Sequence, residues 1–248
     1  VGEVLVDLVG DHPDAVLGRP PPDRGDLPGG VHDARRVRRR HEEQGLGVRC
    51  AGRLELVDGH PEARGHVGDG AAAAIITTPE IARTFRDDYV LVKGLGLAVG
   101  SFGMLRDDWD FVHFPENVRA AQAAYQEADI TNPREEIDLA SVHDCFTITE
   151  LIIAEDMGFS PRGRGREDVE AGTFTLEGDL PINTDGGLKC FGHPVGASGI
   201  RMIYEVYKQL QGNAGPRQLK NPSLGLTHNL GGRPGSFTCS VAIFGTRD

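Results

Sequence analysis

Nine amino-acid types are missing from the first 70 residues of this 248-residue chain. They are Phe, Tyr, Trp, Met, Ile, Lys, Ser, Thr and Asn, whereas the remaining 178 residues contain 59 of them. At that later frequency, a blank of 70 positions has a chance probability on the order of one in a million million. The composition therefore marks a real boundary near residue 68.

All codons of the missing types begin with A or T. Nearly every codon of residues 1–68 therefore begins with G or C, as is typical when GC-rich DNA is translated out of frame or from the opposite strand. Two interpretations stay open, a translation artefact and a genuine low-complexity arm. Both predict a disordered segment with no core, because aromatic side chains and sustained apolar periodicity are absent. The arginine-rich run at 35–40 is then a solvated stretch rather than a nucleic-acid patch.

Cysteine is scarce and widely spaced, with single residues at positions 50, 145, 190 and 239. This spacing does not suggest a disulfide framework and favours reduced thiols in a cytoplasmic protein. The sequence has no apolar run long enough to cross a bilayer and no signal-peptide pattern. The net charge is −11, with 26 basic and 37 acidic side chains, which argues against nucleic acid or a membrane as partner.

From residue 69 onward the sequence alternates predicted strands and helices, which indicates an α/β protein with a layered sheet. Strands are expected at 71–78, 89–99, 137–142, 223–229 and 237–244. Helices are expected at 79–85, 115–128 and 146–157. A last helix is expected where apolar residues recur at helical spacing from Ile200, and it should end at Gly212. A charged loop is expected at 160–170. We therefore take residues 69–248 as one domain.

The most informative motif is the run Gly-His-Pro-Val-Gly-Ala-Ser-Gly at 192–199, which opens the last predicted helix. Its small residues leave backbone N–H groups accessible where the helix dipole is positive, and His193 stands beside them. Such a site suits a reaction that develops negative charge on a carbonyl oxygen. The alternative is that the glycines only make a tight turn and that His193 caps the helix.

Three other polar elements accompany this motif. His143-Asp144-Cys145-Phe146 places a thiol between a predicted strand and helix, where the helix N-terminus favours a thiolate, although such a cysteine is often just a small buried residue. The run His-Asn-Leu-Gly-Gly at 228–232 is expected in the turn between the last two strands. The run Asn-Thr-Asp-Gly-Gly at 183–187 is expected in a turn that frames the His193 loop.

Two further patterns have competing interpretations. The glycines at 94, 96 and 100 follow an apolar run and suggest a dinucleotide-binding loop, but no convincing helix follows at 101–111. His143 and Cys145 together with Cys190 and His193 offer four zinc-ligand types. Neither pair has the compact spacing of a structural zinc knuckle, so no metal is expected.

Four motifs, in this order along the chain, resemble those of the thiolase superfamily, specifically its sterol-carrier-protein type and the bacterial lipid-transfer-like relatives. They are Asp-Gly-Ala-Ala-Ala at 69–73, His-Asp-Cys-Phe at 143–146, the motif at 192–199 and Asn-Leu-Gly-Gly at 229–232. The resemblance implies a layered α-β-α fold built from two similar halves. This chain would supply the last strand of the first half and the whole C-terminal half.

The same resemblance implies thioester chemistry, with coenzyme A as a substrate rather than a bound cofactor. His193 would activate a nucleophilic cysteine and help to hold the thioester oxygen. His143 would position an oxyanion-hole water, and the N–H of Gly231 would serve a second oxyanion hole. Asn229 takes the place of the usual acid/base cysteine, and Cys145 would substitute for it.

Ser198 and Ala197 are weaker candidates for contact with coenzyme A. In thiolases the nucleophilic cysteine and the loop domain that binds much of the coenzyme A belong to the first half. Residues 1–68 resemble neither, and Cys50 has no matching context. We therefore expect an acyl-CoA acyltransferase of thiolase type that is incomplete and inactive alone.

Two alternatives come from other classes. One is a non-catalytic thiolase-like module that binds an acyl group or a partner, and the other is a retro-aldolase subunit acting on a β-hydroxyacyl-CoA. The expected partners are a second copy of the chain or a small acyl-binding protein. A half-fold also predicts an apolar sheet face left uncovered.

Overall fold

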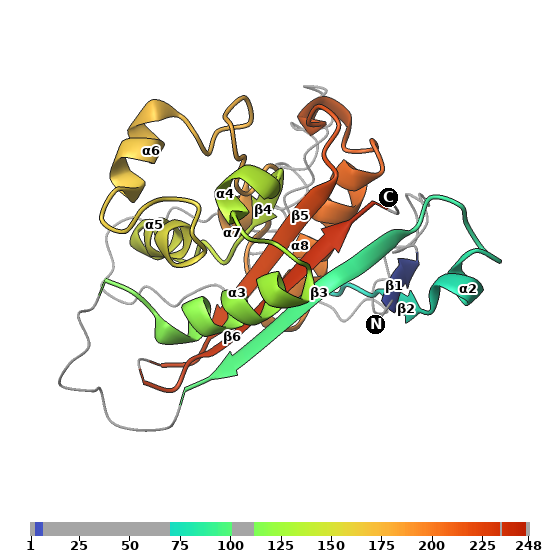
Figure 1. Ribbon diagram of the computed structural model, residues 1–248, viewed down its shortest axis with the longest axis horizontal. Helices are drawn as coiled ribbons and strands as arrows, with labels where there is room; N and C mark the ends of the chain where they lie inside the picture. Colours follow the sequence, from blue (N-terminus) through green and yellow to red (C-terminus); the bar gives the residue numbers. More distant parts are fainter. Residues whose placement is uncertain (1–2, 7–69, 101–111, 234, 247–248) are drawn as a thin grey trace, which may run out of the picture.

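The computed structural model describes residues 3–6, 70–100, 112–233 and 235–246 (Figure 1). Within these ranges one mixed sheet has the strand order β2-β1-β3-β6-β5-β4. The strands are β1 (Glu3–Val6), β2 (Ile75–Thr77), β3 (Val90–Val99), β4 (Leu139–Ser141), β5 (Leu224–Gly231) and β6 (Thr238–Gly245). β4 and β5 run parallel, and the other neighbouring pairs in this sheet are antiparallel.

The helices are α2 (Pro79–Ala82), α3 (Pro115–Glu127), α4 (Pro133–Glu136), α5 (Thr147–Asp156), α6 (Gly165–Ala171), α7 (Gly187–Phe191) and α8 (Val195–Leu210). Four of the helices, α2, α3, α5 and α8, lie where helices were expected, whereas α4, α6 and α7 were not expected. Proline stands in the first turn of α2, α3 and α4, where its missing N–H costs nothing. Two residues after α8, Gly212 adopts a left-handed φ of 73°, which ends the helix as its position predicted.

Helices cover the two faces of the sheet. On the first face, called here the α3 face, Ala120 and Ala124 of α3 join a core with Leu226, Val241 and Ile243. On the opposite α8 face, Val206 and Tyr207 of α8 pack with Leu139 and Phe244. Alternate residues of a strand point to opposite faces, so β5 presents His228 to the α3 face and Asn229 to the α8 face.

Two glycines allow α3 to lie directly on β3. A Cβ atom at Gly94 would stand 2.2 Å from the carbonyl oxygen of Ala124, and one at Gly96 would stand 1.8 Å from that of Ala120. The first part of the glycine pattern is therefore a strand that packs closely against a helix, and this explains its spacing without a nucleotide. Residues 101–111, for which the sequence predicts no convincing helix, lie outside the described residues.

Part of the α8 face has no helix over it in the described structure. Leu95, Leu97 and Val99 of β3 form a row there and are 51%, 70% and 52% exposed. Their partners on β6 include Thr238 and Ser240, which are exposed as well. The predicted uncovered apolar face is thus confirmed for the described residues, and we call Leu95, Leu97 and Val99 the open row.

The structure corrects the expected loop at 160–170. Its second part folds into α6, which ends at Gly172 with a left-handed φ of 79°. The Asp168 carboxylate on α6 binds Arg134, with 2.7 Å between Nη2 and Oδ1, and accepts a hydrogen bond from Ser160. These contacts come from distant parts of the chain, which a local apolar pattern does not reveal.

The structure describes only four residues before the composition boundary near residue 68. These residues, Glu3–Val6, form β1 and pair with β2 and β3. Residues 7–69 lie outside the described residues, so the expectation that they form no core remains a prediction. None of the helices in the described ranges is both long and apolar enough to cross a membrane.

Candidate active site

Two motifs that are far apart in the sequence bring their histidines together beside the carboxyl ends of β4 and β5. The ring centroids of His143 and His193 lie 4.9 Å apart, with the ring planes at 68°. His143 follows β4 by two residues and is 7% exposed, whereas His193 is exposed just before α8. The result is a corner with one buried and one accessible imidazole.

The hydrogen bonds around His193 assign its tautomer. The Ser198 hydroxyl lies 3.1 Å from the Pro194 carbonyl oxygen and donates to it. Because that hydroxyl has one proton, Nδ1 of His193, 2.8 Å away, donates to the Ser198 oxygen. In the neutral ring Nε2 then carries the lone pair, so His193 can accept a proton through Nε2.

Asp144 ties the first motif to the loop that leads to His193. Its Oδ1 accepts a hydrogen bond of 2.9 Å from the backbone N–H of Leu188 in α7. A Cβ atom at Gly187 would stand 2.2 Å from Oδ2, and Gly187 also has a left-handed φ of 60°. Only glycine meets both conditions. The two histidine-bearing segments are therefore fixed to each other.

The predicted framing turn at 183–187 is confirmed. The side-chain oxygen of Asn183 accepts a hydrogen bond of 2.8 Å from the N–H of Val142, at the end of β4. Asp185 forms an ion pair with Arg201 of α8. The Arg201 guanidinium also lies over the Phe191 ring, 4.7 Å from its centroid, so α7 is held against α8.

The remaining predicted site residues occupy the same end of the sheet. Cys145 is an exposed free thiol between β4 and α5. Gly231 ends β5, and a Cβ atom there would meet nothing within 4 Å, so its backbone is open to approach. A Cβ atom at Gly199 in the first turns of α8 would lie 3.5 Å from the Asn229 amide group. β5 and α8 therefore meet at this corner.

Two sequence-based expectations need adjustment here. The residues from His228 to Gly231 lie in β5 rather than in the turn, because the ladder to β6 continues as far as the pair Gly231 and Thr238. The side chains of Ser198 and Ala197 are 1% and 6% exposed, and the Ser198 hydroxyl is bonded to His193. Contact of these two residues with coenzyme A stays a prediction.

The two imidazoles differ in electrostatic environment. Burial lowers the pKa of His143, and a charge on His193 lowers it further, while Asp144 acts in the opposite direction. His143 is therefore neutral at pH 7 and can offer an N–H without carrying charge. A buried, neutral imidazole beside an exposed one suits acid/base work on one substrate.

Of the four residues considered as zinc ligands, His143 and His193 lie together. In the described part of the chain no group of three or more His, Cys, Asp and Glu side chains is arranged to hold a metal ion.

A buried polar network lies on the α3 face, behind the two histidines. Nε2 of His228 is 3.0 Å from Oδ1 of Asn117, and Nδ2 of Asn117 donates to Oδ2 of Asp156 at 3.0 Å. The same Asp156 oxygen accepts a 2.9 Å hydrogen bond from the N–H of Phe114, before α3. Sequence reasoning missed this network, because Asn117 is 111 residues from His228 and carries no motif.

This network predicts opposite pH effects on stability. Burial lowers the pKa of His228 from 6.5 to about 3 and raises that of Asp156 from 3.8 to about 6. The unfolded chain protonates His228 more readily, so the stability that neutral His228 contributes is lost as the pH falls from about 6.5 toward 3. The folded chain holds the Asp156 proton more tightly, so that contribution is lost as the pH rises from about 4 through 6.

We therefore expect the His228→Gln variant to gain stability relative to the wild type as the pH falls from 6.5 to 4. The Asp156→Asn variant should change in the opposite direction, losing relative stability over the same range. Urea unfolding at half-unit pH steps measures both trends. Curves of all three proteins that stay parallel would contradict the assignment of these two groups.

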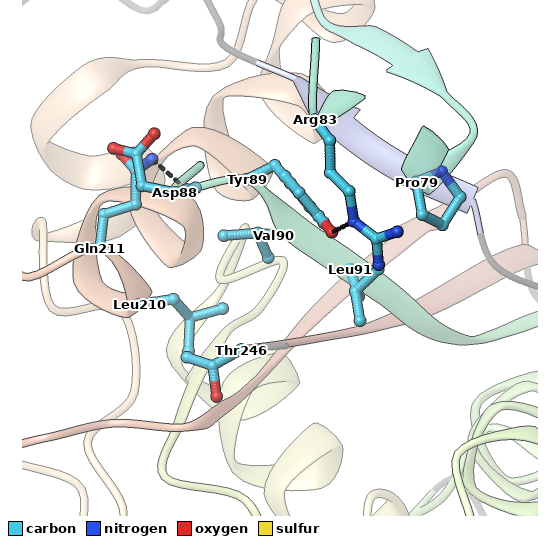
Figure 2. A pocket seen from close by; sticks show the side chains of 9 residues that line it. All are labelled: Pro79, Arg83, Asp88, Tyr89, Val90, Leu91, Leu210, Gln211 and Thr246. Atoms are coloured by element: carbon cyan, nitrogen blue, oxygen red, sulfur yellow. Dashed lines mark hydrogen bonds between the residues drawn. The ribbon is translucent and has the colours of Figure 1, made fainter. Parts of the chain in front are cut away.

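The cavity in Figure 2 is separate from this corner. It has a volume of about 620 Å³ and is lined by residues including Pro79, Arg83, Tyr89, Leu210 and Gln211. Leu210 ends α8, whereas His193 precedes its first residue, and a helix of 16 residues is about 24 Å long. Nε of Arg83 donates to the Tyr89 hydroxyl at 3.1 Å. The cavity is thus not part of the candidate active site.

Comparisons with known proteins identify the family. A family profile described as "Thiolase C-terminal domain-like" matches residues 103–246. The acetyl-CoA acetyltransferase of Methanothermobacter thermautotrophicus is 41% identical over 191 residues, which cover 77% of this chain and 47% of that protein. Sterol carrier protein 2 of Homo sapiens is 34% identical over 167 residues, covering 66% of this chain and 30% of that protein.

Solved structures agree at the level of the fold. The Ltp2-ChsH2(DUF35) aldolase has a TM-score of 0.61 at 24% identity, covering 71% of this chain and 44% of that one. The chain spans less than half the length of these three proteins. With its sheet and helices, and with a profile match over more than half of its residues, this chain belongs to the thiolase family through the C-terminal domain.

Proposed function

We propose that this domain supplies the acid/base and oxyanion groups of a thiolase-type acyltransferase acting on 3-oxoacyl-CoA. The observation that carries the proposal is the pair of imidazoles 4.9 Å apart, in which His193 presents a free Nε2 and His143 stays neutral. The match to acetyl-CoA acetyltransferase supports the same chemistry.

In the thiolytic direction each group has one task. Nε2 of His193 takes the thiol proton of a nucleophilic cysteine, whose sulfur then attacks the 3-oxo carbon of the substrate. Donors at the site stabilise the resulting oxyanion, and the bond between C2 and C3 breaks. The acetyl-CoA enolate takes a proton from Cys145. The thiol of a second coenzyme A loses its proton to the thiolate of Cys145, and its sulfur then displaces the cysteine from the acyl group. The released cysteine takes its proton back from Nε2 of His193.

The open row suggests where the nucleophile enters. Asn229 pairs with Ser240 on β6, and Ser240 pairs with Leu97 on β3. Neighbouring strands are about 4.8 Å apart, so Leu97 is roughly 10 Å from Asn229 on the face that α8 shares. An element that covers Leu95, Leu97 and Val99 would therefore reach the His193 corner. We propose that this element carries the nucleophilic cysteine.

A second candidate function is retro-aldol cleavage of a β-hydroxyacyl-CoA in a complex with a partner protein. The structural likeness to the Ltp2-ChsH2(DUF35) aldolase favours keeping it, although at 24% identity that likeness concerns the fold. A second copy of this chain is the other proposed partner. The free thiols of Cys145, Cys190 and Cys239 support the proposed cytoplasmic location.

A chimera tests the first function. Residues 70–248 would replace the corresponding part of the Methanothermobacter acetyl-CoA acetyltransferase, with which the chain shares 41% identity. We expect the present chain alone to leave acetoacetyl-CoA intact and the chimera to cleave it in the presence of coenzyme A. The parent enzyme is the positive control, and circular dichroism verifies folding.

Two results would contradict the proposal. The first is a folded chimera that is inactive while the parent enzyme is active, and the second is cleavage by the present chain alone that Cys50→Ala abolishes. A chimera that cleaves only β-hydroxyacyl-CoA would favour the aldolase function instead.

A further inference from the structure

The buried network behind the site contains a histidine with a fixed tautomer. Nδ2 of Asn117 donates to Asp156, so Oδ1 of Asn117 faces His228 as an acceptor. Nε2 of His228 therefore carries the proton, and Nδ1 carries the lone pair. His228 and Asn117 are 0% exposed, so neither arrangement is exchanged for contact with solvent.

His228 also lies where the site is assembled. It immediately precedes Asn229 on β5, whose parallel neighbour β4 leads into His143. Asn117 belongs to α3, and Asp156 ends α5, the helix that begins just after Cys145. One chain of hydrogen bonds thus joins the three elements next to the site: β5, α3 and α5.

We propose that His228 is a positioning residue of the thioester site, held in the neutral Nε2–H form by Asn117 and Asp156. It fixes the end of β5 that carries Asn229 and Gly231, and it places an uncharged ring behind His143. The proposal rests on the proposed function, whereas the hydrogen bonds of His228 and Asn117 that carry it lie within this chain.

The surroundings of His228 favour the neutral ring. On α3 it faces Asn117, with Glu116 next in sequence, and on α5 it faces Asp156 through Asn117. Cys239 of β6 is buried nearby, and Asp156 and Glu116 raise the pKa of its thiol after burial has done so. The remaining neighbour is His143, whose charge lowers the pKa of His228 after burial.

Nitrogen NMR of the imidazoles in the full ¹⁵N-labelled chain tests this, between pH 5 and 9. In the wild type, we expect His228 to remain neutral with the proton on Nε2 at every pH. The His228→Leu variant should shift the apparent pKa of His143 by about half a unit or more, or change its tautomer ratio. In the His228→Gln variant the new amide can still donate to Asn117. The apparent pKa and the tautomer ratio of His143 should therefore stay as in the wild type.

The proposal is overturned by a wild-type His228 that carries its proton on Nδ1 or titrates in this range. It is also overturned if the imidazole nitrogen shifts of His143 and His193 are the same in the folded Leu variant as in the wild type at every pH. His228 would then be a purely structural residue. The wild-type measurement decides the tautomer even where the Leu variant does not fold. Because no reading requires catalysis, failure here is distinct from failure of the proposed function.

Discussion

Replacing Gly96 by alanine should lower the free energy of unfolding by about 3 kcal/mol, the upper part of the range for overpacked cores. The new methyl group would lie 1.8 Å from the carbonyl oxygen of Ala120, which belongs to the α3 backbone and cannot rotate away. α3 would have to move off β3, and the core on the α3 face would loosen with it. Urea unfolding followed by circular dichroism measures the loss.

Gly196→Ala is the matched control. Gly196 lies in the first turn of α8, and a Cβ atom there meets nothing within 4 Å. We expect this change to be neutral or to stabilise the protein by up to about 1 kcal/mol, since alanine favours a helix more than glycine does. Equal losses in the two variants would show that close contact with α3 is not the reason for the glycine at 96.

In the active chimera, His193→Ala should reduce kcat for acetoacetyl-CoA cleavage by about 10²- to 10⁴-fold, the usual contribution of a general base. Nε2 of His193 is the proton acceptor that the Ser198 hydrogen bond leaves free. A coupled absorbance assay of thioester cleavage measures the loss.

Ser198→Ala separates the base from its support. This change removes the acceptor for Nδ1 but leaves the ring of His193 in place, so a smaller loss of kcat is expected. A His193→Ala chimera with undiminished kcat would exclude His193 as the base. It would leave Cys145 and His143 as the acid/base candidates at this corner.

Local patterns in the sequence predicted the parts of the fold that local forces decide. The apolar spacing from Ile200 to Leu210 and the glycine at 212 predicted α8, and the alternating runs predicted β3, β5 and β6. The short helix α7 was missed, because its five residues are held by Asp144 from another motif. Its reason for existing is not in its own sequence.

The candidate site shows the same division. The motifs containing His143 and His193 were recognisable as chemistry, and the structure brings their rings together. The supports were not recognisable, because each is an ordinary residue made special by a distant partner. Arg201 acts through Asp185 and Phe191, and Asn117 acts through a histidine 111 positions away. Pairing over such separations leaves no periodic trace in one sequence.

The two edges of the described sheet limit how this domain can associate. β2 and β4 at the edges are three residues long each, and β4 is further bordered by a bridge between Ala140 and Ile182. Such short edges offer little for strand addition, a common route to sheet extension between molecules. Association should therefore proceed by stacking on the face of the sheet. It should weaken on cooling and persist at high salt, as expected for contacts dominated by apolar surface.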